Sequence, residues 1–179
     1  MEFKKLANDA IKFGINRIIE ILGLCIILMG VFLLISLATF SPDDPNFIFP
    51  DNTVIKNFLG FRGSFTSDIF FQFFGLIALL IPLSLIISGI NIILNKKIFL
   101  IIESIFYTII YSLIGSFFFS FFYPIAFDLY INGNGGFIGK YLETTFLTSL
   151  ININSQISYY LLIFLILILF LISVQFKVS

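Results

Sequence analysis

The sequence predicts an all-α membrane protein with four transmembrane helices, both termini in the cytoplasm, and a short outer interfacial or re-entrant helix before the last crossing. Two observations predict this class. The mean hydropathy is +1.11, and 59% of the residues are hydrophobic while only 11% are charged. A soluble domain usually carries about 25% charged residues. In addition, four apolar runs have about the 20 residues that a helix needs to cross the hydrocarbon core.

The apolar runs set the boundaries of the predicted segments. Each span is expected to be helical, because backbone amides in lipid must be satisfied within their own segment. The first run is too long for a signal peptide and lacks a small-residue cleavage site after it, so we expect it to be retained. The predicted segments are a cytoplasmic amphipathic arm at 1–17, a span at 18–40, a periplasmic loop at 41–68, a span at 69–94, a cytoplasmic loop at 95–97, a span at 98–123, a periplasmic loop at 124–156 with an interfacial helix at about 137–151, a span at 157–176 and a cytoplasmic tail at 177–179.

The distribution of lysine and arginine predicts the orientation. Seven basic residues fall in the arm, the second loop and the tail: Lys4, Lys5, Lys12, Arg17, Lys96, Lys97 and Lys177. The two long loops hold three: Lys56, Arg62 and Lys140. Cytoplasmic segments carry the excess of Lys and Arg. Both termini are therefore predicted to be cytoplasmic, with the long loops outside.

The N-terminal arm has the pattern of a short amphipathic helix. Phe3, Leu6, Ala10 and Phe13 recur three or four residues apart, and lysines and an asparagine occupy other positions around the helix. Such a helix suits the surface of an anionic inner leaflet. The alternative is a frayed leader that only solvates the first span.

No residues point to catalysis, a cofactor or a metal, and we expect the chain itself not to be an enzyme. It contains no histidine, the commonest general base and metal ligand. Asp43 and Asp44 follow the first span next to prolines, where acidic residues set turns; a cation site is the alternative interpretation. The formal net charge of zero predicts no direct binding of nucleic acid by this segment.

Glu103 is the one acid well inside a predicted span. It lies about 10 Å from Lys96 and Lys97 along a helix that rises 1.5 Å per residue, so it can reach the cytoplasmic interface. The alternative is a proton or ion relay in a small transporter or channel subunit of the inner membrane. A transporter is expected to show several facing intramembrane polar residues or an internal repeat, and the sequence shows neither.

Small residues in the first two spans are candidates for close helix packing. Their backbones can approach closely where no hydrophobic driving force acts between helices. These contacts would form within one chain, or between chains in a homo-oligomer. The candidates are Gly23, Gly30, Gly75, Ser84, Ser88 and Gly89.

Four short motifs, in order and in register, resemble a known family. Ser41-Pro42-Asp43-Asp44-Pro45 is similar to the Ser-x-Asp-Pro turn after the first span of the FtsK/SpoIIIE bacterial DNA translocases. The stretch at 57–64, followed by Asp68 and Phe74-Gly75, resembles the family's N-x-x-G-x-x-G-A leader and its D-x-x-F and F-G pieces; Ser64 stands where alanine is usual. Gly135-Gly136-Phe137-Ile138-Gly139 resembles the G-G-x-x-G before the last span. The loop residues that carry the resemblance are Ser41, Asp44, Pro45, Gly60, Gly63, Asp68, Gly135, Gly136 and Gly139.

The resemblance implies the N-terminal four-span membrane domain of such a translocase. It implies a membrane-anchoring and divisome-interaction domain that acts in cell division and chromosome segregation. The implied partners are the lipid bilayer, divisome membrane proteins and further copies of the chain, at the septum of the bacterial inner membrane. The family's ATP-driven DNA motor is expected to lie outside this chain, which carries no Walker motif.

Overall fold

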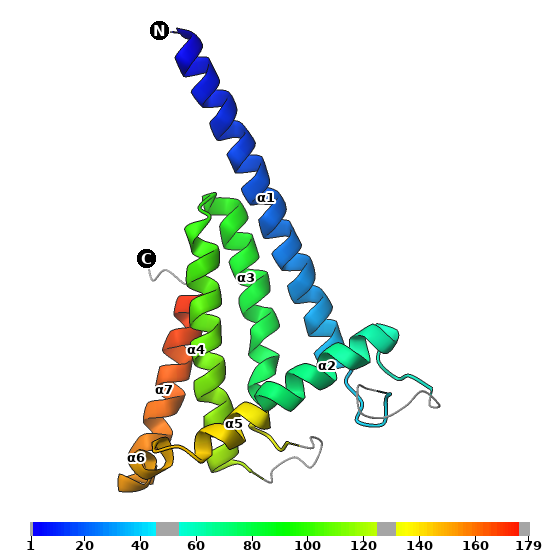
Figure 1. The fold of residues 1–179 in the computed structure, drawn as a ribbon, viewed down its shortest axis with the longest axis vertical. Helices are drawn as coiled ribbons and strands as arrows, with labels where there is room; N and C mark the ends of the chain where they lie inside the picture. Colours follow the sequence, from blue (N-terminus) through cyan, green and yellow to red (C-terminus); the bar gives the residue numbers. More distant parts are fainter. Residues whose placement is uncertain (1, 46–53, 125–131, 176–179) are drawn as a thin grey trace.

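The computed structural model describes residues 2–45, 54–124 and 132–175. Within these ranges the chain is helical and contains no strand (Figure 1). The elements are α1 (Glu2–Ala38), α2 (Gly60–Phe74), the 3₁₀ helix η1 (Gly75–Leu79), α3 (Leu80–Asn95), α4 (Phe99–Phe122), α5 (Gly136–Glu143), α6 (Leu147–Ile153) and α7 (Ser155–Ser173). The predicted tail at 177–179 and parts of both long loops lie outside the described residues.

The described residues contain four helical stretches that are long and apolar enough to cross a membrane. They are Leu6–Ala38, Gly60–Asn95, Phe99–Phe122 and Ser155–Ser173. The predicted all-α class with four crossing helices is therefore confirmed. Many large apolar side chains on these helices are exposed, as expected for surfaces that face lipid.

The first helix is longer than the predicted span. The sequence divides the predicted arm at 1–17 from a span at 18–40, whereas α1 runs from Glu2 to Ala38 with no break. Residues 2–38 contain no proline, and a helix without one can continue past the membrane surface. In Figure 1, the first turns of α1 extend well beyond the turn between α3 and α4.

The second predicted span differs most from the structure. Its predicted start is residue 69, within a continuous apolar run, but α2 already begins at Gly60 and ends at Phe74. Figure 1 shows α2 lying across one end of the bundle, while α3 runs alongside α1. The direction changes at Gly75, whose backbone angles are φ 67° and ψ −146°. Residues 69–74 thus belong to the transverse helix, and η1 with α3 forms the upright part.

The predicted interfacial helix at about 137–151 is two short helices. α5 ends at Glu143 and α6 begins at Leu147. α5 packs against α2 and α4 at the end of the bundle where α2 lies. The third and fourth predicted spans agree with α4 and α7 to within a few residues.

Two apolar clusters hold the bundle together. The first joins α1, α2, η1 and α3 through Leu33, Leu37, Phe71, Ala78 and Ile81. The second joins η1, α4 and α7 through Ile77, Tyr111, Phe118 and Ile166. Because η1 contributes to both, the bend at the start of the second crossing lies at the centre of the packing. The start of α1, the α3–α4 turn and the end of α7 all face the same end of the bundle (Figure 1).

Candidate functional site

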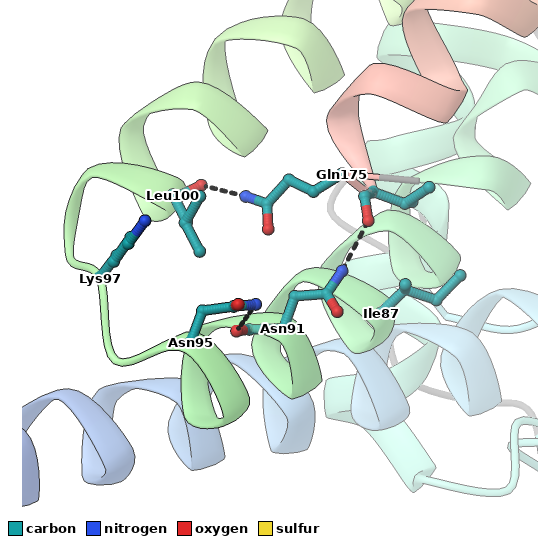
Figure 2. Close-up of a pocket in the computed structure, with 7 residues that line it drawn as sticks. Ile87, Asn91, Asn95, Lys97, Leu100 and Gln175 are labelled. Carbon is teal, nitrogen blue, oxygen red and sulfur yellow. Dashed lines mark hydrogen bonds between the residues drawn. The ribbon is translucent and has the colours of Figure 1, made fainter. Parts of the chain in front are cut away.

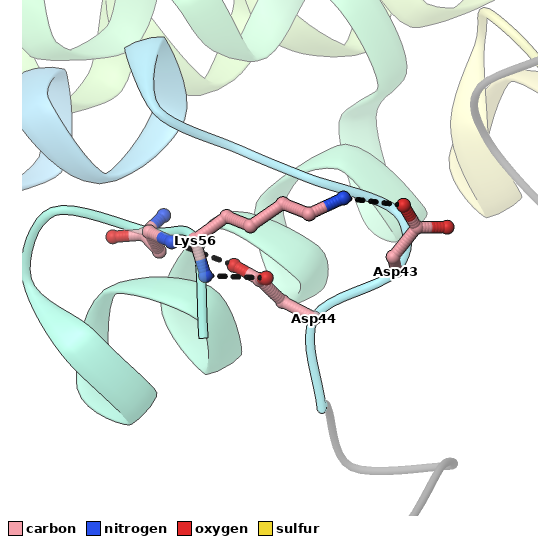
Figure 3. A network of polar contacts seen from close by, with 4 residues as sticks. Asp43, Asp44 and Lys56 are labelled. Atoms are coloured by element: carbon pink, nitrogen blue, oxygen red, sulfur yellow. Dashed lines mark hydrogen bonds and ion pairs between the residues drawn. The ribbon is translucent and has the colours of Figure 1, made fainter. Parts of the chain in front are cut away.

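The end of α1 is tied to the start of α2 by a buried carboxylate. Asp44 is 2% exposed. Its two oxygens accept the backbone N–H groups of Lys56 at 2.7 Å and Asn57 at 2.8 Å (Figure 3). Hydrogen bonds to an ionised acceptor are stronger than neutral ones. Asp44 therefore closes the loop that connects the two helices.

Asn57 completes this connection from the other side. Its side-chain amide donates to the carbonyl oxygen of Ser36 in the last turn of α1 at 2.9 Å, and to that of Thr39, directly after the helix, at 3.2 Å. Its side-chain oxygen accepts the N–H of Leu59. Helix ends leave such carbonyls without intrahelical partners, and Asn57 satisfies two of them. We call Ser36, Asp44, Asn57 and Gly63 the α1–α2 clasp.

Gly63 belongs to the clasp because only a glycine fits there. A Cβ at this position would overlap the side-chain amide of Asn57. The carbonyl of Gly63 also accepts the hydroxyl of Ser36. The predicted motif residues Asp44 and Gly63 are thus brought together with Asn57. Asn57 belongs to the same motif as Gly63 but was not among the predicted site residues.

The remaining loop residues of the first two motifs lie around the clasp. The carbonyl of Ser41 accepts the N–H of Asp44 at 3.2 Å, and the carbonyl of Pro45 accepts the hydroxyl of Ser64 at 2.8 Å. Gly60 starts α2 at φ +64°. Asp68 is buried on α2, at 5% exposure.

Asp43 and Asp44 have different environments. Asp43 is exposed and pairs with the Lys56 ammonium at 2.7 Å (Figure 3). This carboxylate raises the pKa of Lys56 above its usual value, chiefly through their hydrogen bond. Among the described residues, no three His, Cys, Asp or Glu side chains gather as a metal site would require. In the structure, Asp44 accepts backbone N–H groups in the loop, and Asp43 forms an ion pair with Lys56.

The bend at Gly75 is held by the segment that carries the G-G-x-x-G motif before the last span. A Cβ on Gly75 would overlap the backbone of Asn134 and Gly135, and one on Gly136 would lie 2.6 Å from the carbonyl of Phe73. The N–H of Leu76 donates to the carbonyl of Asn134 at 2.8 Å. Backbone therefore packs directly against backbone. We call Gly75, Gly135, Gly136 and Gly139 the glycine junction.

The other side of the glycine junction rests on α4. A Cβ on Gly135 or Gly139 would overlap the carbonyl of Ser116 and crowd the Cβ of Ser120. The hydroxyl of Ser116 donates to the carbonyl of Phe74 at 2.9 Å, the last residue of α2. The predicted candidate Gly75 thus meets Gly135, Gly136 and Gly139, which lie about 60 residues later in the sequence.

The predicted small residues on α1 and α3 face each other. A Cβ on Gly89 would lie 2.8 Å from the carbonyl of Gly23, and one on Gly30 would lie 3.1 Å from the backbone nitrogen of Ile86. Within this chain, these glycines lie at close contacts between α1 and α3. Small residues commonly occupy such contacts in membranes.

Ser84 and Ser88 lie on the opposite face of α3, where hydroxyl groups connect three helices. The hydroxyl of Ser84 bonds those of Tyr111 at 2.8 Å and Ser173 at 3.0 Å. Ser88 bonds the hydroxyl of Ser104 and the carbonyl of Ser173. We call these five residues the hydroxyl seam; each is buried at 4% exposure or less. Their partners on α4 and α7 were not predicted, since single Ser and Tyr residues in apolar runs give no signal of pairing.

Charged groups gather at the α3–α4 turn. Glu20 of α1 pairs with Lys96 at 2.9 Å and with Arg17 of its own helix. Glu103 lies in the second turn of α4 and is half-buried. The Glu20–Lys96 pair links α1 to the turn, a contact between segments that are distant in sequence and that no local pattern predicts.

Comparison with known proteins decides the family. A family model described as the 4TM region of DNA translocase FtsK/SpoIIIE matches residues 16–179. The chain belongs to this family. The match extends over the clasp, the glycine junction and the hydroxyl seam, so these are features of an FtsK/SpoIIIE 4TM region.

Curated relatives match part of the chain in sequence. A DNA translocase FtsK of Rickettsia typhi is 32% identical over 84 residues, which are 45% of this chain and 11% of the relative. That of Rickettsia bellii is 40% identical over 74 residues, 41% of this chain and 9% of the relative. The aligned part is thus about a tenth of each relative. No solved structure matches the chain significantly.

Proposed function

We propose that this chain is the membrane-anchoring and divisome-interaction domain of a DNA translocase that acts in cell division and chromosome segregation. The observation that carries the proposal is the family match over residues 16–179, which includes the last three crossing stretches in full and the first one from residue 16 onward. The relatives that match part of the chain are named DNA translocase FtsK. In this proposal the ATP-driven motor is a separate part of the protein, and the 4TM region holds it at the septum of the inner membrane.

The arrangement of the helices supports a motor on the cytoplasmic side. The start of α1, the α3–α4 turn and the end of α7 face one end of the bundle (Figure 1). Lys96 and Lys97 occupy that turn, and Lys12 and Arg17 lie on α1 beyond or beside it. The excess of basic residues favours the cytoplasm for this end, and a domain joined after α7 would continue from it.

The opposite end supports contact with other membrane proteins. α2 and α5 lie across this end, and the α1–α2 clasp and the glycine junction fix them to the bundle. Their exposed faces carry large aromatic side chains: Phe61, Phe73 and Phe137 are about half exposed, and Phe58 next to them is 79% exposed. Aromatic residues on a rigid support are frequent at protein interfaces. In the proposal, divisome partners contact this end.

The orientation can be tested with single cysteines in a Cys25→Ser background. Val54 is 89% exposed beside α2, and Lys97 is exposed in the α3–α4 turn. In intact spheroplasts, a membrane-impermeant maleimide is expected to label Val54→Cys, and to label Lys97→Cys only after permeabilisation. The reverse pattern would overturn the predicted topology.

The localisation can be tested with a fluorescent fusion of residues 1–179 in dividing bacteria. We expect fluorescence at the division site. An unrelated four-span protein with the same fluorescent tag serves as the control and should stain the membrane uniformly. Uniform staining by the 1–179 fusion itself, at similar expression, would contradict a septal anchor.

A further inference from the structure

A polar pocket opens where α3 and α7 end and α4 begins. Its volume is about 380 Å³. Asn91, Asn95, Lys97 and Gln175 line it with polar groups, and Ile87 and Leu100 contribute apolar walls (Figure 2). Pockets of a few hundred Å³ with a few converging polar groups are the usual form of small-ligand sites. None of its polar residues belongs to the clasp, the glycine junction or the hydroxyl seam.

Lys97 gives this pocket a positive charge. Its neighbour Lys96 is neutralised by Glu20 at 2.9 Å. Lys97, by contrast, is exposed and forms no ion pair with any residue that the structure describes. Figure 2 shows its side chain beside Leu100 at the rim of the pocket. The local charge therefore favours an anionic group.

The amide side chains of the pocket are held in place by hydrogen bonds to backbone. Asn91 donates to the carbonyl of Val174 at 2.7 Å, Asn95 donates to that of Asn91 at 2.9 Å, and Gln175 donates to that of Leu100 at 2.9 Å. Each amide nitrogen carries a second N–H. The polar wall is thus positioned before any ligand binds.

Gln175 also presents an acceptor without a donor. Its side-chain oxygen is buried and has no hydrogen-bond partner among the described residues. Leaving a buried acceptor unpaired is unfavourable. A bound group that carries an ammonium or a hydroxyl would supply the missing donor. The pocket therefore suits a ligand with both an anionic group and a hydrogen-bond donor.

The pocket lies at the depth of a membrane surface. α3 ends at Asn95 and α4 begins at Phe99, so two apolar helices reach the interface here. Leu94, Ile98 and Phe99 are each more than half exposed around the turn, as lipid-facing side chains are. The anionic group that is abundant in this layer is the phosphate of phospholipids.

We propose that this pocket binds the headgroup of a phospholipid. The phosphate lies against the Lys97 ammonium and the free N–H groups of Asn91 and Asn95. The acyl chains run along Ile87 and Leu100 into the bilayer. A soluble phosphate ester shares the headgroup chemistry but lacks the chains, so the test must separate the two.

The test uses the purified chain in a non-ionic detergent, titrated with dioleoyl phosphatidylglycerol while bound lipids are counted by native mass spectrometry. Lys97→Gln is expected to weaken binding about tenfold, because a charge-assisted hydrogen bond is lost. Lys96→Gln is the matched control: it removes the same charge one residue away, outside the pocket, and should bind nearly as the unaltered chain does. Both side chains are exposed, and an exposed ion pair such as Glu20–Lys96 contributes little to stability, so neither change should prevent folding.

Two results would overturn the proposal. Equal losses in Lys96→Gln and Lys97→Gln, or no loss in either, would mean that lipid binds the turn only by its overall charge or elsewhere. Displacement of the lipid by glycerol phosphate at similar concentration would assign the pocket to a soluble phosphate ester. Dioleoylglycerol, which has the same chains without phosphate, is expected to bind the unaltered chain and Lys97→Gln equally.

Discussion

The carboxylate of Asp44 accepts the backbone N–H of Asn57 at 2.8 Å, and the side chain of Asn57 in turn donates to the last turns of α1. Both residues are buried, at 2% and 4% exposure. A polar contact of this kind is stabilising only while every partner is present. Removing the Asp44 side chain leaves the backbone N–H of Asn57 without its acceptor, and removing the Asn57 side chain leaves the carbonyls of Ser36 and Thr39 without their donor.

Replacing Asp44 tests these contacts. Asp44→Ala leaves two backbone N–H groups without an acceptor, so we expect the free energy of unfolding to fall by about 2–4 kcal/mol. Asp44→Asn keeps one acceptor and should lose less. Unfolding of the purified protein, followed by circular dichroism in mixed micelles with added SDS, measures both.

Asp43→Asn is the control for this experiment. Asp43 is exposed and its partner Lys56 is exposed as well. Exposed ion pairs contribute little, so this variant should unfold almost as the unaltered protein does. A loss as large as that of Asp44→Ala would show that charge near the loop matters more than the buried hydrogen bonds.

Gly75→Ala is expected to prevent stable folding. The added Cβ would overlap the backbone of Asn134 and Gly135, and neither backbone segment can rotate away. Gly75 also has a positive φ, which a side chain disfavours. We expect little folded protein in the membrane fraction, measured by fluorescence-detected size exclusion.

Gly60→Ala separates the effect of the positive φ from the effect of the backbone overlap. Gly60 has a φ of +64°, close to the +67° of Gly75, but nothing lies within 4 Å of the position that an added Cβ would occupy. The variant should therefore lose only about 1–2 kcal/mol, the cost of the left-handed backbone. Equal behaviour of the two variants would mean that backbone strain, and not the contact with Asn134 and Gly135, makes glycine necessary at Gly75.

Gly89→Ala should weaken the contact between α1 and α3. Its Cβ would lie 2.8 Å from the carbonyl of Gly23 and 3.1 Å from the backbone nitrogen of Ile27, so the helices must move apart. Gly14→Ala is the opposite case, since nothing lies within 4 Å of that position. There, the higher helix propensity of alanine should stabilise α1 by up to about 1 kcal/mol. Thermal unfolding should rank Gly14→Ala above the unaltered chain and Gly89→Ala below it.

Tyr111→Phe removes one hydroxyl from the seam. Ser84 retains Ser173 as a partner, so we expect a loss of only about 0.6–1.5 kcal/mol, as for other hydrogen bonds between helices in membranes. Tyr107→Phe, one turn earlier on α4 and outside the seam, should be neutral. Identical unfolding of both variants would remove the seam from the interactions that stabilise the bundle.

The four crossings could be predicted because their signal is local. Each apolar run is long enough by itself to cross the membrane. In lipid, a single crossing segment can satisfy its backbone hydrogen bonds within itself only as a helix. The bend at Gly75 could not be placed in the same way. The apolar residues continue through it, and the reason for the bend lies at Asn134 and Gly136, about 60 positions away in sequence.

The motif residues show what sequence could and could not provide for the site. The pattern singled out Asp44, Gly63 and Gly136 without showing what they touch. Asn57 stands at the start of the same motif as Gly63, and a residue that combines a donor and an acceptor in a glycine-containing turn could have been included. Tyr111 and Ser173 had no such signal, because their importance depends on the way in which α3, α4 and α7 pack.

The continuous first helix has a mechanical consequence. α1 contacts α3 closely at both Gly23 and Gly30, and the clasp joins its last turn to α2. From Gly23 to Glu2 the helix measures about 32 Å, at 1.5 Å per residue. Because no proline interrupts this stretch, a change in the tilt of α1 within the bundle would be carried to its N-terminal end.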